Sequence, residues 1–483
     1  MGIFQPLDLT VMDTIPVAPP PESTEETTLL PLTFLDMMWL PLPHVHRLLF
    51  YPNPVSRTHF LHTLIPAIKT SLSQSLQHYT PLAGRLILSP HISVLPEIRY
   101  APGDTVPLVI AVSDSSERVF DHLVSDGVKS CSLFHPLVPS LPPAASTESP
   151  AAGFSLPLLA LQVTLFPDVG ICVGVTNHHV VGDARSIFGF MKSWAFFSSN
   201  PNPSTISDLP SQFLPVYDRR PITDQRGLGK IFWDSLKNIK IHETSLHLLP
   251  SIAGKVRATF TLTSDQIEML KNRILARRPD IPHVSSFTVA CAYVWHCLVR
   301  SRHEVGGVYS GDELFLCAAD CRARLDPPLP GNYFGNCLTA CFGKAEVGEL
   351  IGEDGLAEAA AVIGDSVRRR LYSGEGDGLF EGAEDWFKMF AGMRPDRVFS
   401  LAGSPNFDYY GLDIGWGKGK KFEMPSIDIT GAISIGASRI EEEEGGGGGG
   451  REFGVTLPVT HMDTFAKIFA QGLIFVRLNK LVE

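Results

Sequence analysis

Two histidines in the sequence are each followed four residues later by an aspartate, a spacing that suits general-base chemistry. The pairs are His122 with Asp126 and His179 with Asp183. A histidine fits this work because its unperturbed pKa is about 6.5, so the side chain accepts a proton at neutral pH. The composition alone predicts about one such pair by chance, so the surrounding residues must decide between the two.

The surroundings favour His179. It follows the apolar run GICVGVT, and Gly182 permits a sharp turn before the helix-like segment SIFGFMKSWAFF. A strand that ends at a histidine holds the imidazole at a rigid edge, facing a cleft. Asp183 either orients the imidazole or braces the turn, and the spacing does not distinguish these roles. His122 lies in a polar, helix-like stretch instead, which is typical of a surface pair with Asp126.

Other catalytic motifs are missing from the sequence. It contains no Gly-x-Ser-x-Gly elbow, no Gly-x4-Gly-Lys-Ser/Thr phosphate loop and no His-Glu-x-x-His zinc motif. Eight cysteines are present, and two pairs have i,i+4 spacing within the apolar segments LFLCAADC and GNCLTACF. Structural zinc sites use tighter Cys-x2-Cys turns, so we expect no metal site and interpret these cysteines as buried free thiols.

The elements that must position His179 alternate between helix and strand. Leucines and isoleucines recur at helical spacing over residues 61–76, which predicts an amphipathic helix that ends near Tyr79. Residues 158–166 and 170–176 have the pattern of paired strands joined by a Pro-Asp-Val-Gly turn. His179 is therefore expected just beyond the second strand of a hairpin.

The second half of the sequence has the same mixture. A strand over residues 259–263 precedes a helix capped by Ser264 or Asp265, and Ser285 and Ser286 open another helix. Strands mixed with helices in both halves favour an α/β fold of two layered domains.

Composition bounds the class of this 483-residue protein. A hydrophobic content of 44% excludes intrinsic disorder, and 42 Gly with 38 Pro predict many turns and long connections. The net charge of −11 argues against a nucleic-acid-binding protein, because such proteins usually carry an excess of basic residues. The sequence has no apolar run of about 18 residues for a membrane span, and no basic, apolar leader at its N-terminus. We therefore expect a cytoplasmic protein without nucleic-acid or membrane partners.

Four segments are too polar or too rich in Pro and Gly to join a packed core. They cover residues 16–26, 139–153, 200–212 and 441–450. The last consists of four Glu and six Gly between strand-like segments, so we interpret it as a flexible insertion that lengthens a hairpin.

Several motifs follow one another along the chain in a known order. They are PLTFLDMMWL at 31–40, HYTPLAGRL at 78–86, DCRARLDPPLP followed by NYFGNC at 320–337, and DIGWG at 413–417. With His-x3-Asp, they resemble the BAHD family of plant coenzyme A-dependent acyltransferases, whose signatures are His-x3-Asp and Asp-Phe-Gly-Trp-Gly. The resemblance runs from about residue 5 to the C-terminus. The Tyr-Phe-Gly-Asn-Cys variant is similar to the anthocyanin and flavonoid glucoside branch, which includes malonyltransferases.

The resemblance implies roles for the central pair. His179 would deprotonate the acceptor hydroxyl, and the freed oxygen would attack the thioester carbonyl of an acyl-coenzyme A. Asp183 would point away from the acceptor and pair with an arginine, for which Arg322 is favoured and Arg324 is the alternative.

It also implies a structural loop near the coenzyme A channel, built from Asp413, Gly415, Trp416 and Gly417. Ile414 departs from the family pattern, which has Phe at this position. Coenzyme A contacts are implied on the second domain, where Ser285 and Ser286 could meet phosphate or pantetheine. Because coenzyme A is anionic, an acidic protein needs a local group of basic residues to bind it. Lys418, Lys420 and Lys421 are one candidate group.

The fold implied is α/β, with two chloramphenicol acetyltransferase-like domains, mixed sheets and an active-site channel between them. The domains would cover residues 1–199 and 229–483, joined by a crossover loop at 200–228. The reaction implied moves a malonyl or hydroxycinnamoyl group to a hydroxyl of a phenolic, flavonoid or anthocyanin glucoside. Acyl-coenzyme A, with malonyl-coenzyme A favoured, would be a co-substrate beside no tightly bound cofactor, and the protein would be a monomer.

Two alternatives stay open. His178-His179-x3-Asp183 also resembles the His-His-x3-Asp-Gly of carrier-protein-dependent condensation domains, which share the architecture. The third hypothesis is a catalytically silent small-molecule binding protein of the same fold.

Overall fold

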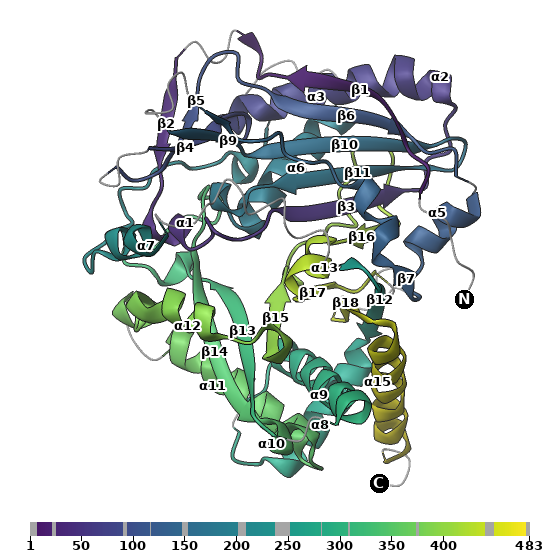
Figure 1. Cartoon of the computed structure of the whole chain (residues 1–483), viewed down its shortest axis with the longest axis vertical. Coiled ribbons are helices and arrows are strands. Elements are labelled where there is room, and N and C mark those ends of the chain that lie inside the picture. Colours follow the sequence, from purple (N-terminus) through teal and green to yellow (C-terminus); the bar gives the residue numbers. More distant parts are fainter. Residues whose placement is uncertain are drawn as a thin grey trace.

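The structure is a computed structural model, and it describes residues 7–21, 26–89, 94–115, 117–146, 153–200, 209–236, 252–281, 283–307, 310–372, 376–439 and 449–479. Figure 1 shows two halves, with the N-terminal part of the chain in purple and blue above the C-terminal part in green and yellow. Each half is built around a mixed sheet, as expected for an α/β fold of two domains.

The sheet of the upper half has six strands. Their order across the sheet is β1 (Thr10–Val17), β6 (Val106–Val112), β10 (Leu159–Phe166), β11 (Gly170–Asn177), β3 (Val45–Tyr51) and β16 (Lys421–Glu423). The pair β6 and β10 is parallel, and the other neighbours are antiparallel. Every residue of β10 and β11 is buried, because helices and the other sheets cover both faces.

The sheet of the lower half has seven strands. Their order is β14 (Leu338–Glu346), β13 (Asp312–Asp320), β15 (Val398–Ala402), β17 (Ile433–Ala437), β18 (Arg451–Pro458), β12 (Lys255–Leu262) and β7 (Lys129–Ser130). A smaller sheet at the far side of the upper half has the order β2 (Thr28–Pro31), β5 (Glu97–Tyr100), β4 (Arg85–Leu88), β9 (Phe154–Pro157) and β8 (Ala145–Ser146).

Helices cover the sheets of both halves (Figure 1). In the upper half these are α1 (Phe34–Met37), α2 (Arg57–His59), α3 (Ile65–His78), α4 (Thr80–Ala83), α5 (Glu117–Val124), α6 (Ala184–Ser199) and α7 (Leu228–Leu236). In the lower half they are α8 (Ser264–Arg277), α9 (Ser286–Gly306), α10 (Val347–Ile351), α11 (Gly355–Tyr372), α12 (Trp386–Gly392), α13 (Ser426–Thr430) and α15 (Val459–Asn479). Within the described residues, no helix combines the length and the apolar character that a membrane span needs.

Each half contributes one short strand to the main sheet of the other half. β16 comes from the C-terminal part of the chain and pairs with β3, whereas β7 comes from the N-terminal part and pairs with β12. The division at residues 199 and 229 stays a prediction, and these two strands cross it. α7 also packs on α1 of the upper half, so the start of the second domain at residue 229 would fall within a helix of the first.

The sequence patterns located several of these elements. The helix predicted over 61–76 is present and ends at Tyr79, and the predicted strands near His179 are β10 and β11. The prediction that Ser264 or Asp265 caps α8 was wrong. Thr263 is the N-cap residue, because its hydroxyl accepts a hydrogen bond from the Gln266 N–H (3.3 Å). β17 and β18 form the hairpin predicted around the Glu/Gly insertion, whose residues 441–448 lie outside the described residues. All eight cysteines are buried with free thiols, as predicted.

Candidate active site

His179 opens a short 3₁₀ turn (His179–Val181) directly after β11. β11 is held between β10 and β3 along its whole length, so the histidine stands at the end of a rigid central strand. Gly182 follows with extended backbone at φ 163°, so the turn does not need a left-handed residue here. Glycine is required by close approach instead, because a Cβ on Gly182 would lie 2.8 Å from the Cβ of Ser186.

Asp183 turns away from His179 and caps α6. Its Oδ1 accepts a hydrogen bond from the Ser186 N–H (3.1 Å), and its Oδ2 accepts one from the Cys337 N–H (3.1 Å). Oδ2 also lies 2.7 Å from Nη1 of Arg322, and the exposed side-chain fractions of Asp183 and Arg322 are 2% and 4%. Burial alone would lower the pKa of Arg322, but Asp183 raises it above its usual range. Arg324 contacts the Leu371 carbonyl and the Tyr372 hydroxyl, so Arg322 is the arginine that pairs with Asp183.

The imidazole of His179 lies against an aromatic ring. The indole of Trp39 stacks on it, with ring centroids 4.2 Å apart and ring planes 12° apart. The His179 carbonyl accepts a hydrogen bond from Nδ2 of Asn336 (3.1 Å), which fixes the backbone of His179. Within the described residues, Nδ1 of His179 has no hydrogen-bond partner.

The surroundings keep His179 in its neutral, proton-accepting form. Burial lowers the pKa of His179 to about 4, and the nearby Arg47 guanidinium adds to this effect, whereas Asp183 and Asn336 oppose it. A base with this pKa is unprotonated over the whole neutral range. The geometry therefore supplies a half-buried neutral imidazole, ready to accept a proton.

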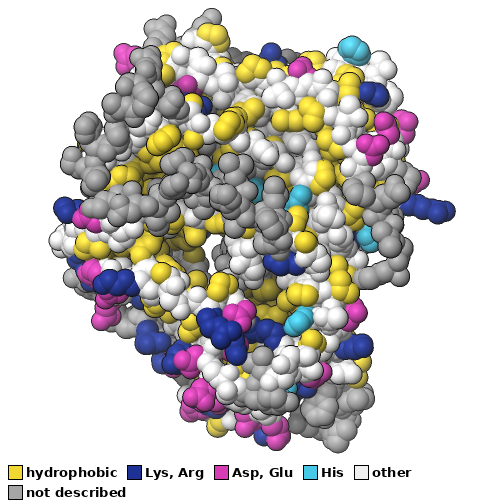
Figure 2. All heavy atoms as spheres, in the orientation of Figure 1, with side chains coloured by type: hydrophobic (Ala, Val, Ile, Leu, Met, Phe, Trp, Pro, Cys, Tyr) yellow, Lys and Arg dark blue, Asp and Glu magenta, His cyan; other side chains and the backbone are white. Residues whose placement is uncertain are grey.

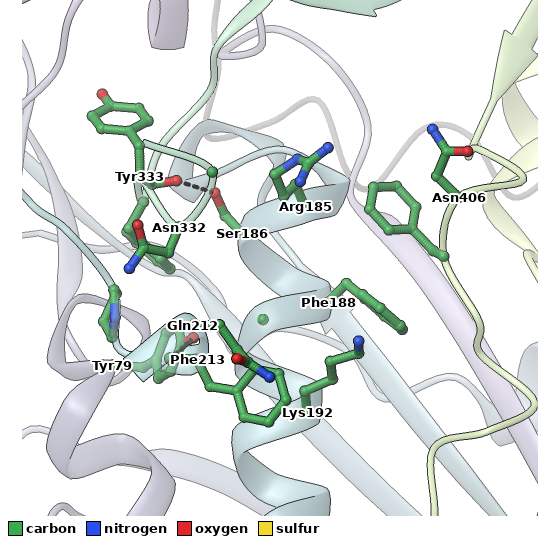
Figure 3. A pocket seen from close by; sticks show the side chains of 15 residues that line it. Tyr79, Arg185, Ser186, Phe188, Lys192, Gln212, Phe213, Asn332, Tyr333 and Asn406 are labelled. Atoms are coloured by element: carbon green, nitrogen blue, oxygen red, sulfur yellow. Dashed lines mark hydrogen bonds between the residues drawn. The ribbon is translucent and has the colours of Figure 1, made fainter. Parts of the chain in front are cut away.

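A cavity of about 250 Å³ borders the first turns of α6 (Figure 3). It is lined by Arg185, Phe188 and Lys192 of α6, by Phe213 of the segment before the second half, and by loop residues that include Asn332 and Asn406. No acidic residue lines it among the described residues. Figure 2 shows a hollow between the two halves, with hydrophobic side chains along part of its wall. The predicted channel between the domains stays a prediction.

Lys192 lines this cavity, and its charge is not paired with a carboxylate of a described residue. Its Nζ lies 4.8 Å from the ring centroid of Phe188 and 5.5 Å from that of Phe213, and it forms no ion pair with a described residue. Arg185 pairs with Asp320 at 2.9 Å, at an exposed position. Because two cations and amide groups face a cavity without acids, this cavity suits an anionic ligand.

The loop that carries Asp413 lies at the other end of α6 from His179. Oδ1 of Asp413 accepts hydrogen bonds from the N–H groups of Gly415, Trp416 and Gly417 at 2.8 to 2.9 Å. Gly415 and Gly417 have φ values of +88° and +80°, which explains both glycines. The Ser199 hydroxyl donates to the Asp413 carbonyl at the end of α6. A helix of 16 residues is about 24 Å long, so this loop does not meet His179.

The remaining residues of this loop pack on the core. The Trp416 ring meets Tyr51 edge to face, with centroids 5.6 Å apart. Ile414 is buried in the main core, so the smaller side chain at this position is accommodated.

Residues proposed to hold coenzyme A are not gathered at His179. Ser285 caps α9, where its hydroxyl accepts a hydrogen bond from the Thr288 N–H (3.1 Å), and neither Ser285 nor Ser286 lines the cavity beside α6. Lys421 is only 1% exposed and binds Asp126 and Thr259, so it offers no basic surface. The expected basic group of Lys418, Lys420 and Lys421 is therefore wrong for Lys421, whose charge is already neutralised.

Sequence reasoning did not assign roles to the residues that surround the histidine. Trp39 and Asp36 belong to PLTFLDMMWL, and Asn336 belongs to NYFGNC, so both segments were singled out but only as family markers. Their local spacing does not indicate that Asn336 contacts Asp36, 300 positions away, and the backbone of Val180, 156 positions away.

Known proteins place the chain in a family. A family profile described as the Transferase family matches residues 7–471. Phenolic glucoside malonyltransferase 1 of Nicotiana tabacum is 39% identical over 468 residues, covering 96% of this chain and 99% of that protein. Malonyl-coenzyme A:anthocyanin 3-O-glucoside-6''-O-malonyltransferase of Dahlia pinnata is 38% identical, with 96% and 98% covered. The crystal structure of vinorine synthase matches with a TM-score of 0.66 at 21% identity, covering 95% of this chain and 96% of that chain, which bears on the fold.

The chain thus has the two-domain α/β fold of vinorine synthase, with a half-buried histidine just after a central strand. The chain belongs to the BAHD family and is an acyltransferase.

Proposed function

We propose that the protein transfers an acyl group, preferentially malonyl, from coenzyme A to a hydroxyl of a phenolic or flavonoid glucoside. The observation that carries this proposal is the neutral imidazole of His179 at the end of β11, in a chain that is 39% identical to a phenolic glucoside malonyltransferase. Relatives that use coumaroyl-coenzyme A are also similar, at 34 to 35% identity, so the hydroxycinnamoyl group is the second choice of donor.

In the proposed reaction, His179 removes the proton of the acceptor hydroxyl as the oxygen attacks the thioester carbonyl. The tetrahedral intermediate collapses, the carbon–sulfur bond breaks, and coenzyme A leaves as the thiolate, which takes the proton back from the imidazolium. A positioned base contributes about 10²–10⁴-fold to such a reaction. Asp183 has no part in the proton transfer, because both of its oxygens are engaged with Arg322 and backbone N–H groups.

The cavity beside α6 is proposed to hold the phosphate groups of the donor. Lys192 lies nine residues beyond Asp183, which corresponds to about 14 Å along the helix axis. The extended phosphopantetheine arm of coenzyme A spans such a length, so phosphates at Lys192 leave the thioester near His179. A charge-assisted hydrogen bond to phosphate contributes about 1.5–3 kcal/mol.

Replacement of Lys192 with Ala is predicted to raise the KM for the acyl-coenzyme A about tenfold and to leave kcat within about twofold. A tenfold change corresponds to about 1.4 kcal/mol, which is within the range for one charged hydrogen bond. Initial rates over a series of donor concentrations measure both constants. Lys230→Ala, which removes an exposed lysine paired with Asp234, is the matched control. An unchanged KM in Lys192→Ala would place the phosphates elsewhere.

The proposed function is tested with a donor panel against one flavonoid glucoside. The donors are malonyl-, coumaroyl- and acetyl-coenzyme A, together with malonyl groups attached to an acyl carrier protein. The expected result is product from free malonyl-coenzyme A at the highest kcat/KM, detected by mass spectrometry. Transfer only from the carrier protein would support the condensation-type alternative, and binding without turnover would support a silent protein.

A further inference from the structure

We propose that Trp39 is the positioning residue of His179: the face of its indole ring fixes the plane of the imidazole and excludes water from it. The catalytic consequence rests on the proposed function, whereas the structural consequence for the imidazole does not. Histidine bases in other enzymes are commonly held by a carboxylate bonded to the second ring nitrogen. His179 has no such carboxylate among the described residues, since Asp183 turns away.

The stacking geometry supports this role. Ring planes only 12° apart with centroids at 4.2 Å place the two rings in stacked contact, so rotation of the imidazole about its χ2 angle would collide with the indole. A ring held in one plane keeps its free nitrogen aimed in one direction. Such orientation is the part of catalysis that a small displacement destroys.

Trp39 is in turn fixed to the same backbone that holds His179. The backbone N–H of Trp39 donates to the carbonyl of Asp36 (3.1 Å), and the carboxylate of Asp36 accepts hydrogen bonds from the N–H (2.9 Å) and Nδ2 (3.2 Å) of Asn336. Nδ2 of Asn336 also donates to the carbonyls of His179 and Val180. The backbone segments that carry the indole and the imidazole are therefore joined by hydrogen bonds, while the two rings contact each other through their faces.

The Asp36 carboxylate is itself firmly anchored. It is fully buried, it caps α1 by accepting from Thr33, and it forms an ion pair with Arg219. Segments from three distant parts of the chain thus meet beneath Trp39.

Burial, rather than the charges that face His179, is the main reason why the pKa of this histidine is low. Arg47 on β3 disfavours the protonated ring, while Asp183 and Asn336 favour it, and burial is the largest effect on its pKa. His178, the neighbour on the chain, has a pKa of about 3 because it is also buried, so it stays neutral. The indole covers one ring face and is part of that burial.

The test is a histidine NMR titration of three full-length proteins: the wild type, Trp39→Leu and Trp39→Phe. Leucine keeps the apolar bulk but removes the aromatic face, whereas phenylalanine keeps the face and removes the indole N–H. In Trp39→Leu, the pKa of His179 is expected to rise by at least about one unit, because water reaches the ring. In Trp39→Phe it is expected to stay within about 0.3 unit of the wild type. The His179 signals are identified by their loss in His179→Ala.

A control and a second readout keep the result unambiguous. Trp416→Leu removes another half-buried tryptophan at the far end of α6, and it is expected to leave the His179 titration unchanged. If the protein transfers acyl groups, Trp39→Leu is expected to lose about tenfold in kcat with KM within about twofold, and Trp39→Phe to recover most of this loss. Circular dichroism confirms that each variant is folded.

The inference is overturned if folded Trp39→Leu titrates at the wild-type pKa of His179, or if Trp39→Phe shifts this pKa as far as Trp39→Leu does. A wild type without acyl-transfer activity would remove the proposed function only, because the titration needs no substrate.

Discussion

At the scale of single residues, the ion pair of Asp183 and Arg322 gives the aspartate that follows His179 a structural role. The pair is buried, and the carboxylate also caps α6, so it joins the helix to the loop that carries Cys337. Removing one member of a buried pair leaves an unpaired charge and costs about 3–5 kcal/mol. Replacing both members costs less for the same reason.

Replacement of Asp183 with Asn is predicted to lower the free energy of unfolding by about 3 kcal/mol and to leave kcat of the folded fraction within about tenfold of the wild type. The double variant Asp183→Asn, Arg322→Met is predicted to be more stable than Asp183→Asn, because no charge is left unpaired. Urea unfolding of both proteins measures the difference. A fully stable Asp183→Asn with a loss above about 10²-fold in kcat would show that the aspartate acts in the chemistry.

Local sequence predicted His179, because a strand followed by a sharp turn is a short-range signal, whereas the pairing of Asp183 with Arg322 or Arg324 was implied only by the family resemblance. Trp39 could not be predicted as the partner of His179, since 140 residues separate them and stacking leaves no trace in spacing. Asn336 was hidden for the same reason. Its role depends on a contact with Asp36 across 300 residues.

At the scale of elements, α6 organises the site. Its first turn carries the Asp183 cap beside His179, its exposed side carries the cations of the cavity, and its last turn meets the Asp413 loop. The Asp413 loop lies about 24 Å from the Asp183 cap, so the two family signatures lie at opposite ends of α6. Linear motifs could not reveal this distance.

Replacement of Asp413 with Ala is predicted to lower the free energy of unfolding by about 1–2 kcal/mol, because three backbone N–H groups lose their acceptor. Asp413→Asn keeps one side-chain oxygen in place and is predicted to lose less than about half as much. Thermal unfolding followed by circular dichroism compares the two. Equal losses in both variants would contradict the role of Oδ1 as the common acceptor.

At the scale of the whole molecule, the exchanged strands β7 and β16 tie the halves together. Lys129 on β7 lies 3.2 Å from Glu423 on β16, and Arg257 on β12 lies 2.7 Å from the same carboxylate. Burial alone would raise the pKa of Glu423, but Arg257 and Lys129 lower it to about 2. Strands of two and three residues carry no periodic pattern, so the sequence could not indicate this exchange.

The lowered pKa values of three histidines predict that the protein loses stability in acid. Burial lowers the pKa of His46 and His178 to about 3 and that of His179 to about 4. The unfolded chain binds protons at these sites from about pH 6.5 downward, while the folded chain binds them only near pH 4 or below, so stability falls as the pH drops through this window. Each histidine contributes up to about 1.4 kcal/mol per pH unit.

The free energy of unfolding is therefore predicted to fall by about 2 kcal/mol or more between pH 7 and pH 5.5. Urea midpoints at several pH values measure it. Replacing the exposed His59 with Gln is the control, with an unchanged slope. A midpoint that is constant or rises toward acid would contradict the burial of these histidines.

The central claim is that His179 is the base of an acyl-transfer reaction, and direct comparison of His179→Ala with the wild type tests it. Both proteins are incubated with malonyl-coenzyme A and a phenolic glucoside, and product is measured by mass spectrometry. His122→Ala, from the other His-x3-Asp pair, is the matched control and is predicted to keep its activity. His179→Ala is predicted to lose about 10²–10⁴-fold in kcat while remaining folded. Undiminished transfer by folded His179→Ala would contradict the account.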